Sequence, residues 1–151
     1  MKLVLGVILL CTVSAHRDPD ELKTATELIE SRGFIPETHF VTTDDGYILT
    51  LHRIVNPFVG RSLLRRPVLL QHGLISSSVE FLNNAPGPQA SLYDELDLPN
   101  ITVSNNLGFV LSQFGFDVWL SNSRGNMYSL NHKYLNSNNG KLSYFRFYHQ
   151  V

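Results

Sequence analysis

The sequence predicts an α/β fold built on a sheet that contains a parallel pair of strands. Two short apolar runs, residues 68–70 and 117–120, indicate buried strands, and the apolar positions of residues 107–114 between them favour a helix. A β-hairpin over residues 38–54 precedes the first run. The chain has 151 residues, of which 43% are hydrophobic and 17% charged, so it fits one globular domain with a single core.

Residues 1–15, MKLVLGVILLCTVSA, combine one lysine, a short apolar run and small residues before His16. This pattern is typical of a signal peptide and predicts an exported protein. The alternative is a membrane anchor, but the run is shorter than the roughly 20 apolar residues that a spanning helix needs. No transmembrane segment is expected elsewhere. Cleavage before His16 removes Cys11, the only cysteine, so no disulfide or thiol chemistry is expected.

The first element of the mature chain is a predicted amphipathic helix. Asp18 is the expected N-cap, Pro19 takes the first helical position and Glu21 follows three residues after the cap. Gly33 supplies the stop. The predicted apolar face consists of Leu22, Ala25, Leu28 and Ile29.

The hairpin is predicted from two β-branched and aromatic runs divided by Asp44-Asp45-Gly46. An Asp-Gly pair between such runs is a strong hairpin signal, because both central residues of the turn can take positive φ. Calcium binding by the aspartates is the alternative, but the spaced acidic ligands and the later glutamate are missing.

An irregular surface excursion is expected over residues 81–106, with a helical turn near 92–96. It contains a glycosylation sequon at Asn100, which marks a surface position in an exported chain.

The candidate functional residues follow the two apolar strands, in segments 71–74 and 121–126. The carboxyl ends of parallel strands meet at one edge of a sheet, where free backbone amides converge. We expect Gly73 to turn the chain sharply so that the backbone amide of Leu74 faces a cleft and can bind a developing oxyanion. His72 is expected to shape this turn.

Several other functions are excluded by composition and motif. Without the signal peptide the chain has 11 basic and 13 acidic residues, so no basic face for nucleic acid is expected. The histidines show no metal-binding spacing and the glycines form no phosphate-binding loop, so we expect neither a metal nor a cofactor. No two of the ten glycines are four residues apart, so a G-x-S-x-G nucleophile elbow is missing.

Three segments together resemble the acid lipase family, which includes gastric and lysosomal acid lipases. They are Asp45-Gly46-Tyr47, then Gln71-His72-Gly73-Leu74, then Asp117-Val118-Trp119-Leu120 followed by Asn122-Ser123-Arg124-Gly125-Asn126. The resemblance implies an incomplete α/β-hydrolase fold. We therefore expect a signal peptide over residues 1–15, a partial α/β-hydrolase lipase region over 16–135 and a divergent tail over 136–151.

By this resemblance the protein hydrolyses fatty-acyl esters, either triacylglycerols or cholesteryl esters, with a serine nucleophile. It implies a secreted or lysosomal protein of lipid metabolism whose partner is the lipid ester substrate. Leu74 would supply one amide of the oxyanion hole, whereas His72 and Ser123 are structural. The catalytic triad of this fold runs in the order serine, acid, histidine. With no nucleophile elbow, we expect an N-terminal fragment that is inactive alone.

Two alternatives come from other functional classes. One is a secreted, non-catalytic module that binds lipid or a partner protein. The other is a different α/β-hydrolase activity, such as a peptidase or general esterase, because strand-end His-Gly turns are shared across that fold. The fragment reading also predicts poor solubility, because a sheet cut after half its strands leaves an unpaired edge and an uncovered apolar face.

Overall fold

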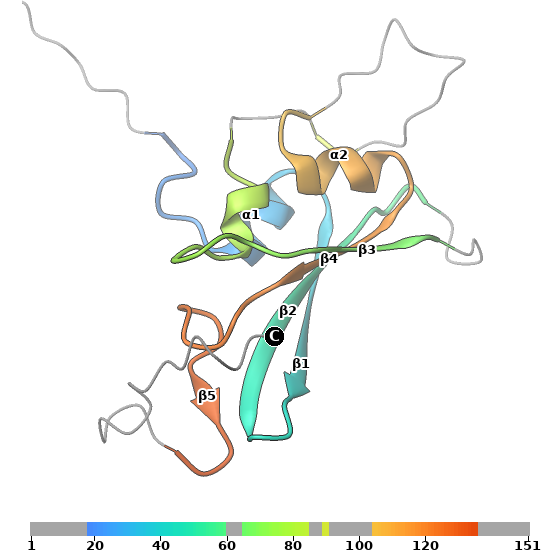
Figure 1. Ribbon diagram of the computed structural model, residues 1–151. Helices are drawn as coiled ribbons and strands as arrows, with labels where there is room; N and C mark the ends of the chain where they lie inside the picture. Colours follow the sequence, from blue (N-terminus) through green and yellow to red (C-terminus); the bar gives the residue numbers. More distant parts are fainter. Residues whose placement is uncertain (1–17, 60–64, 85–88, 91–103, 136–151) are drawn as a thin grey trace, which may run out of the picture.

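The computed structural model describes residues 18–59, 65–84, 89–90 and 104–135 (Figure 1). The predicted signal peptide, the sequon at Asn100, the helical turn near 92–96 and the tail over 136–151 lie outside the described residues. In chain order the elements are α1 (Ala25–Ser31), β1 (Ile35–Thr42), β2 (Tyr47–Val55), β3 (Pro67–Leu70), the 3-10 helix η1 (Ser78–Phe81), α2 (Leu107–Gln113), β4 (Asp117–Ser121) and β5 (Asn131–His132).

The strands form one mixed sheet in the order β1-β2-β4-β3, and the short β5 pairs with β2. β2 runs antiparallel to β1 and to β4, whereas β3 and β4 are parallel. The parallel register pairs Pro67 with Asp117 and Leu70 with Leu120, so both strands end at the same edge of the sheet. The predicted α/β class, with a hairpin and a parallel pair of strands, is confirmed.

Both α-helices lie on one side of the sheet, and the core fills the space between them and the strands (Figure 1). Phe34 and Phe109 stack there with ring centroids 5.1 Å apart, joining the end of α1 to α2. The buried apolar residues of this core are Ala25, Leu28, Ile29, Phe34, Ile54, Leu82, Phe109, Val118 and Leu120.

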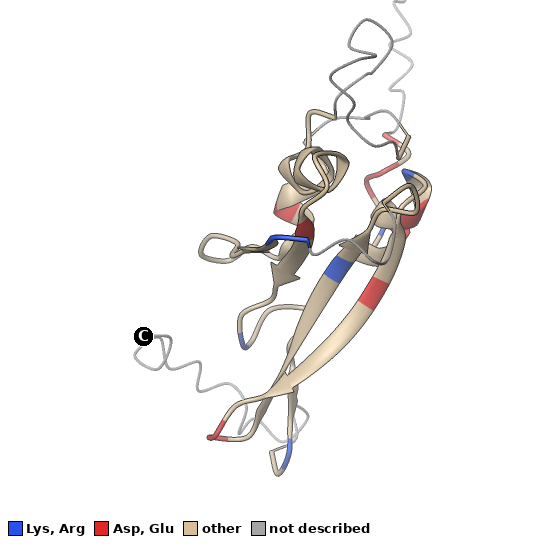
Figure 2. Ribbon diagram, turned by 90° about the vertical axis from the view of Figure 1, so that its right-hand side faces the viewer, with Lys and Arg blue, Asp and Glu red and all other residues tan. Residues whose placement is uncertain are grey.

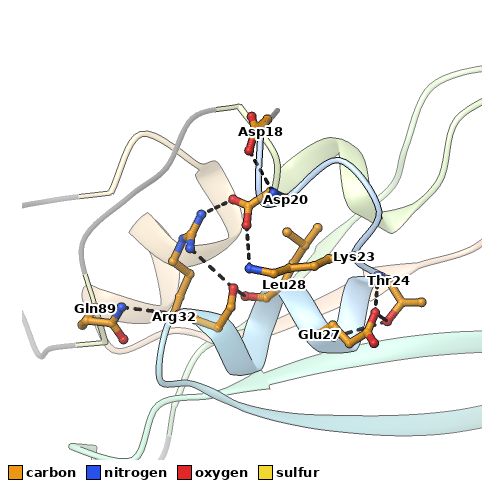
Figure 3. Close-up of polar contacts among 9 residues, drawn as sticks. Asp18, Asp20, Lys23, Thr24, Glu27, Leu28, Arg32 and Gln89 are labelled. Carbon is orange, nitrogen blue, oxygen red and sulfur yellow. Dashed lines mark hydrogen bonds and ion pairs between the residues drawn. The ribbon is translucent and has the colours of Figure 1, made fainter. Parts of the chain in front are cut away.

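The predicted start of the first helix at Asp18 is wrong, because α1 begins at Ala25. Thr24 is the N-cap: its hydroxyl accepts a hydrogen bond from the Glu27 amide, and the Glu27 carboxylate accepts one from the Thr24 amide (Figure 3). This reciprocal pair is a capping box, which satisfies two amides that have no partner within the helix. Gly33, with a φ of 78°, ends the helix as predicted.

The segment before α1 folds into tight turns because its carboxylates find partners elsewhere. Asp18 accepts a hydrogen bond from the Asp20 amide at 2.9 Å. The Asp20 carboxylate in turn binds Lys23, at 2.8 Å, and Arg32 near the end of α1 (Figure 3). These contacts hold the segment beside α1, so the segment does not extend the helix. Leu22, which was predicted for the apolar face, is consequently 79% exposed.

The apolar face that the sequence predicts for α2 consists of Leu107, Val110, Leu111 and Phe114. Leu111 packs against the core, but the fully buried face is a different one. Leu107 and Phe114 are 48% and 47% exposed. The helix instead approaches the sheet through Gly108, where an added Cβ would lie 3.0 Å from the Ile54 side chain. The helix can come this close to the sheet only on the face where glycine, which has no side chain, meets the strands. The residues that α2 buries are Gly108, Phe109, Ser112 and Gln113.

The hairpin joining β1 and β2 is confirmed, but its turn differs from the predicted one. Only Gly46 has positive φ, 94°, so the positive φ expected for both central residues is wrong for Asp45. The Thr43 amide donates to the Tyr47 carbonyl across a three-residue loop, which places a single left-handed residue before β2. An added Cβ on Gly46 would also lie 2.8 Å from the His132 ring.

The sheet face opposite the helices carries an ion-pair network that spans three strands. Arg53 on β2 donates to Asp117 on β4, at 2.7 Å, and to Glu37 on β1, at 2.9 Å. Figure 2 shows that few residues of the strands are charged. Leu69 and Val41 on this face are 61% and 50% exposed. Poor solubility, which such exposure favours, stays a prediction.

The corrected helix start gives a stability test. We expect Thr24→Ala to lower the free energy of unfolding by about 1 kcal/mol, because it removes the capping box. Asp18→Ala is the matched control and should change stability by less than about 0.5 kcal/mol, since Asp18 makes only an exposed local contact. Urea unfolding followed by circular dichroism measures both. A larger loss in the Asp18 variant would contradict this assignment.

Candidate functional site

The candidate site is a cleft of about 1500 Å³ at the carboxyl ends of β3 and β4. Residues 71–77 follow β3, residues 121–127 comprise the last residue of β4 and the loop after it, and both segments line the cleft. Its remaining wall includes apolar side chains of the sheet, among them Leu49, Leu51 and Leu69. The structure thus brings the two predicted functional segments together in one cleft.

The chain after β3 reverses in a β-turn formed by residues 73–76, the 73–76 turn. The Ser76 amide donates to the Gly73 carbonyl at 3.3 Å. Ile75 has a φ of 62° and is the one described residue other than glycine with positive φ. Positive φ at the third position is typical of a type II turn, in which glycine usually occupies that place. The left-handed residue is therefore Ile75, and the prediction that Gly73 makes the sharp turn is corrected.

Leu74 occupies the second position of this turn and lines the cleft. Leu74 is 67% exposed, and its neighbour Ile75 is 96% exposed. Within the described parts of the chain the Leu74 amide has no hydrogen-bond partner. The bond that closes the turn is made by the Ser76 amide. An unpaired amide in an exposed residue beside a cleft suits the predicted oxyanion contact, which stays a prediction.

Glu80 of η1 holds the first residue of the turn. Its carboxylate accepts a hydrogen bond from the Gly73 amide at 3.0 Å. This bond, together with one from the Ser76 side chain, lowers the pKa of Glu80 from its usual value. The carboxylate is therefore ionised at neutral pH, and it binds both ends of the 73–76 turn. Nothing in the local sequence pattern had marked Glu80.

His72 links the two strand-end segments, and all its hydrogen bonds agree with one neutral tautomer. Nδ1 lies 2.7 Å from the Gly73 carbonyl and donates to it. Nε2 then accepts from the Ser123 amide at 3.0 Å and from the Asn126 side chain at 3.2 Å. Its ring is largely buried, 8% exposed. Both ring nitrogens thus serve the loops that line the cleft.

Among the described residues, no base lies within hydrogen-bond reach of the Ser123 hydroxyl. Its Oγ accepts a hydrogen bond from the Gln71 side-chain amide at 2.9 Å, while its backbone amide binds His72. Activation of a serine requires a histidine or another base within hydrogen-bond reach of Oγ. The described contacts therefore give Ser123 a structural place, between the ends of β3 and β4.

Asn122 is the buried hub of the site, 1% exposed. The sequence placed it in the candidate segment 121–126 but gave it no role of its own. Its Oδ1 accepts from the Ser78 amide at 3.0 Å and from the Asn126 side chain at 2.9 Å. Its Nδ2 donates to the Thr50 carbonyl at 3.1 Å and lies 3.4 Å from His52 Nδ1. One side chain therefore joins β2, η1 and the loop after β4.

His52 is a buried member of this network and is held neutral. Burial lowers its pKa from the usual value. Its Nδ1 lies 3.0 Å from the Ser78 hydroxyl, which can donate to it, and its ring meets Tyr128 edge-on at 4.9 Å. His52 therefore contributes packing and an acceptor to the core of the site.

Arg124 attaches the hairpin tip to the cleft. Its guanidinium pairs with the Asp45 carboxylate through contacts of 2.5 and 3.3 Å and lies 4.4 Å from the ring centre of Tyr47. The three segments that carry the family resemblance are thus in contact: His72 joins the second to the third, and Arg124 joins the third to the first.

The described residues contain no cluster of three histidine, cysteine or acidic side chains that would hold a metal ion. Over the same parts of the chain, no helix is long and apolar enough to cross a membrane.

Comparison with known proteins agrees with this geometry. Residues 25–85 match the family model described as the partial alpha/beta-hydrolase lipase region. Lipase member M of Mus musculus is 38% identical over 123 residues, which cover 78% of this chain and 24% of that protein. Lipase 1 of Drosophila melanogaster is 39% identical over 123 residues, 82% of this chain and 23% of its own length. Gastric triacylglycerol lipase of Bos taurus is 34% identical over 133 residues, 87% and 29% of the two chains.

The mixed sheet with helices, and the cleft beyond its parallel strands, define a partial α/β-hydrolase fold. Within that class the comparisons support an acid-lipase-like family. It spans about a quarter of the length of the relatives it matches.

The Asn122 network gives a second stability test. Asn122→Asp replaces the donor group with a buried carboxylate that faces the Thr50 carbonyl and His52. We expect a loss of at least about 3 kcal/mol, because a buried charge is left unpaired. Asn105→Asp, at an exposed position, is the control and should stay within about 0.5 kcal/mol. Thermal unfolding of the protein compares them, and equal stability of the two variants would refute the role of Asn122.

The backbone conformation of Ile75 gives a third test. Asparagine tolerates left-handed backbone far better than a β-branched residue, and the Ile75 side chain contributes almost no burial. We expect Ile75→Asn to stabilise the protein by about 1 kcal/mol. Ile75→Val keeps the β-branch and should leave stability unchanged. A destabilised asparagine variant in the same unfolding assay would show that the turn is not strained.

Proposed function

We propose that this chain supplies one half of the oxyanion hole of a lipase that hydrolyses fatty-acyl esters, triacylglycerols or cholesteryl esters. The observation that carries the proposal is the Leu74 amide, which has no hydrogen-bond partner among the described residues and belongs to an exposed residue in a turn beyond a parallel strand. The apolar wall formed by Leu49, Leu51 and Leu69 suits the acyl chain of such a substrate. The name of one relative, gastric triacylglycerol lipase, agrees with this substrate class.

In the proposed reaction a serine Oγ forms a bond to the carbonyl carbon of the ester, and the carbonyl oxygen gains the electron pair of the broken π bond. The Leu74 amide donates a hydrogen bond to this oxyanion, which stabilises the transition state more than the uncharged ester. The intermediate then collapses: the bond between the carbonyl carbon and the alcohol oxygen breaks, and the alcohol leaves with the proton that the serine hydroxyl gave up. Water then cleaves the acyl-enzyme, releasing the fatty acid and restoring the serine.

We do not assign the nucleophile to any residue of this chain, because its 151 residues contain no G-x-S-x-G motif. In this proposal the 151 residues are inactive by themselves, and hydrolysis needs a catalytic triad that they do not contain. A fluorophosphonate probe tests this point directly. Labelling of a serine in the 151-residue chain would contradict the proposal.

The proposal includes the route that the protein takes. Residues 1–15 act as a signal peptide that directs the chain to secretion or to the lysosome, and Asn100 carries a glycan. N-terminal sequencing of the exported protein should begin at His16. A mass shift on treatment with a glycosidase that removes N-linked glycans tests Asn100.

Leu74→Pro tests the oxyanion contact in the full-length protein encoded by its gene. Proline is favoured at the second position of a type II turn, so this change removes the amide hydrogen while keeping the turn. We expect kcat for ester hydrolysis to fall about 10²- to 10³-fold. Leu74→Ala keeps the amide and should retain most of kcat. If both variants hydrolyse the ester equally well, Leu74 does not bind the oxyanion.

A further inference from the structure

The 73–76 turn holds a conformation that its own sequence disfavours. Ile75 is β-branched and 96% exposed, yet its φ is 62°. Left-handed backbone at such a residue costs about 1–3 kcal/mol and persists only when the surroundings determine it. No burial of the Ile75 side chain offsets this cost. Contacts elsewhere in the turn must therefore fix its shape.

Two side chains outside the turn provide those contacts. His72 donates from Nδ1 to the Gly73 carbonyl, and Glu80 accepts from the Gly73 amide at 3.0 Å. Glu80 also takes a hydrogen bond from the Ser76 side chain, at the other end of the turn. Glu80 does not bind the amides of the two central residues of the turn, Leu74 and Ile75. Both of these residues line the cleft.

The backbone that carries Glu80 is itself fixed. η1 is capped by Ser77, whose side chain accepts from the Val79 amide, and the Glu80 amide donates to the Ser77 carbonyl at 3.0 Å. Ser78, the first residue of η1, is fully buried, and its amide donates to the Asn122 side chain at 3.0 Å. The Glu80 carboxylate therefore reaches the turn from a support that belongs to the buried network.

We infer that Glu80 is a positioning residue, which holds the 73–76 turn so that the Leu74 amide stays available to the oxyanion in the cleft. This inference rests on the proposed function. Glu80 acts through Gly73 and Ser76 and does not touch the reacting atoms. Among the described residues, no group of three histidine, cysteine or acidic side chains that could hold a metal ion includes Glu80.

The test uses the full-length protein and a soluble short-chain ester, p-nitrophenyl butyrate, with kcat and KM measured separately. We expect Glu80→Ala to lower kcat about 10- to 100-fold with KM within about twofold, because the oxyanion contact is made in the transition state. Glu80→Gln should restore most of kcat, since its amide oxygen accepts from Gly73 and its amino group donates to Ser76. Glu30→Ala, at an exposed position of α1, is the control and should match the wild type.

Hydrogen exchange gives a readout that does not depend on turnover. The Gly73 amide should exchange faster in Glu80→Ala than in the wild type and at the wild-type rate in Glu80→Gln. Circular dichroism confirms that each variant is folded before either measurement.

The outcomes separate this inference from the proposed function. If the wild type hydrolyses the ester and Glu80→Ala keeps the full kcat, the positioning role is overturned while the proposed function stands. If Glu80→Gln is as slow as Glu80→Ala, the charge and not the geometry matters, and the inference is again overturned. If the wild type hydrolyses no ester, the proposed function fails and this inference fails with it.

Discussion

The buried side chain of Asn122 is the polar contact on which the candidate site depends. Its oxygen accepts two hydrogen bonds, and its amino group donates to the Thr50 carbonyl and lies within reach of His52. A buried amide with unmet hydrogen-bonding capacity is costly, so each of these partners must keep its place. The loop after β4, strand β2 and helix η1 are thereby held in one arrangement.

The shape of the cleft follows from that arrangement. Because Ser78 is hydrogen-bonded to Asn122, η1 presents Glu80 to the turn after β3. His72, which precedes this turn, binds the Gly73 carbonyl and also accepts from the Ser123 amide in the loop after β4. A left-handed isoleucine then becomes tolerable at Ile75. The strain lies beside the Leu74 amide, which has no hydrogen-bond partner among the described residues. Strain and an unpaired donor at the same place are typical of a functional site and not of a surface turn.

The contacts also explain why three distant segments together indicate one family. Arg124 pairs with Asp45 and covers Tyr47, so the hairpin tip packs on the loop that follows β4. His72 joins that loop to the end of β3. The segments are separated by tens of residues in the chain, but these contacts join them in the fold. Residues 71–74 of the second segment and residues 122–126 of the third line the cleft.

The sequence by itself determined the features that depend on a few neighbouring residues. An Asp-Gly pair gave the hairpin, apolar runs gave β3 and β4, and Gly33 gave the end of α1. The position of Leu74 after a parallel strand was likewise readable, because strand ends meet at one edge of a sheet.

Only the tertiary structure decided where α1 begins, which face α2 buries, and which residue of the 73–76 turn is left-handed. Asp18 is a good cap in isolation, but the capping box at Thr24 and the binding of Asp20 to Arg32 displace it. The Asn122 network escaped the sequence for the same reason. Its partners are up to 72 residues away in the chain, and no local pattern records a hydrogen bond across that distance.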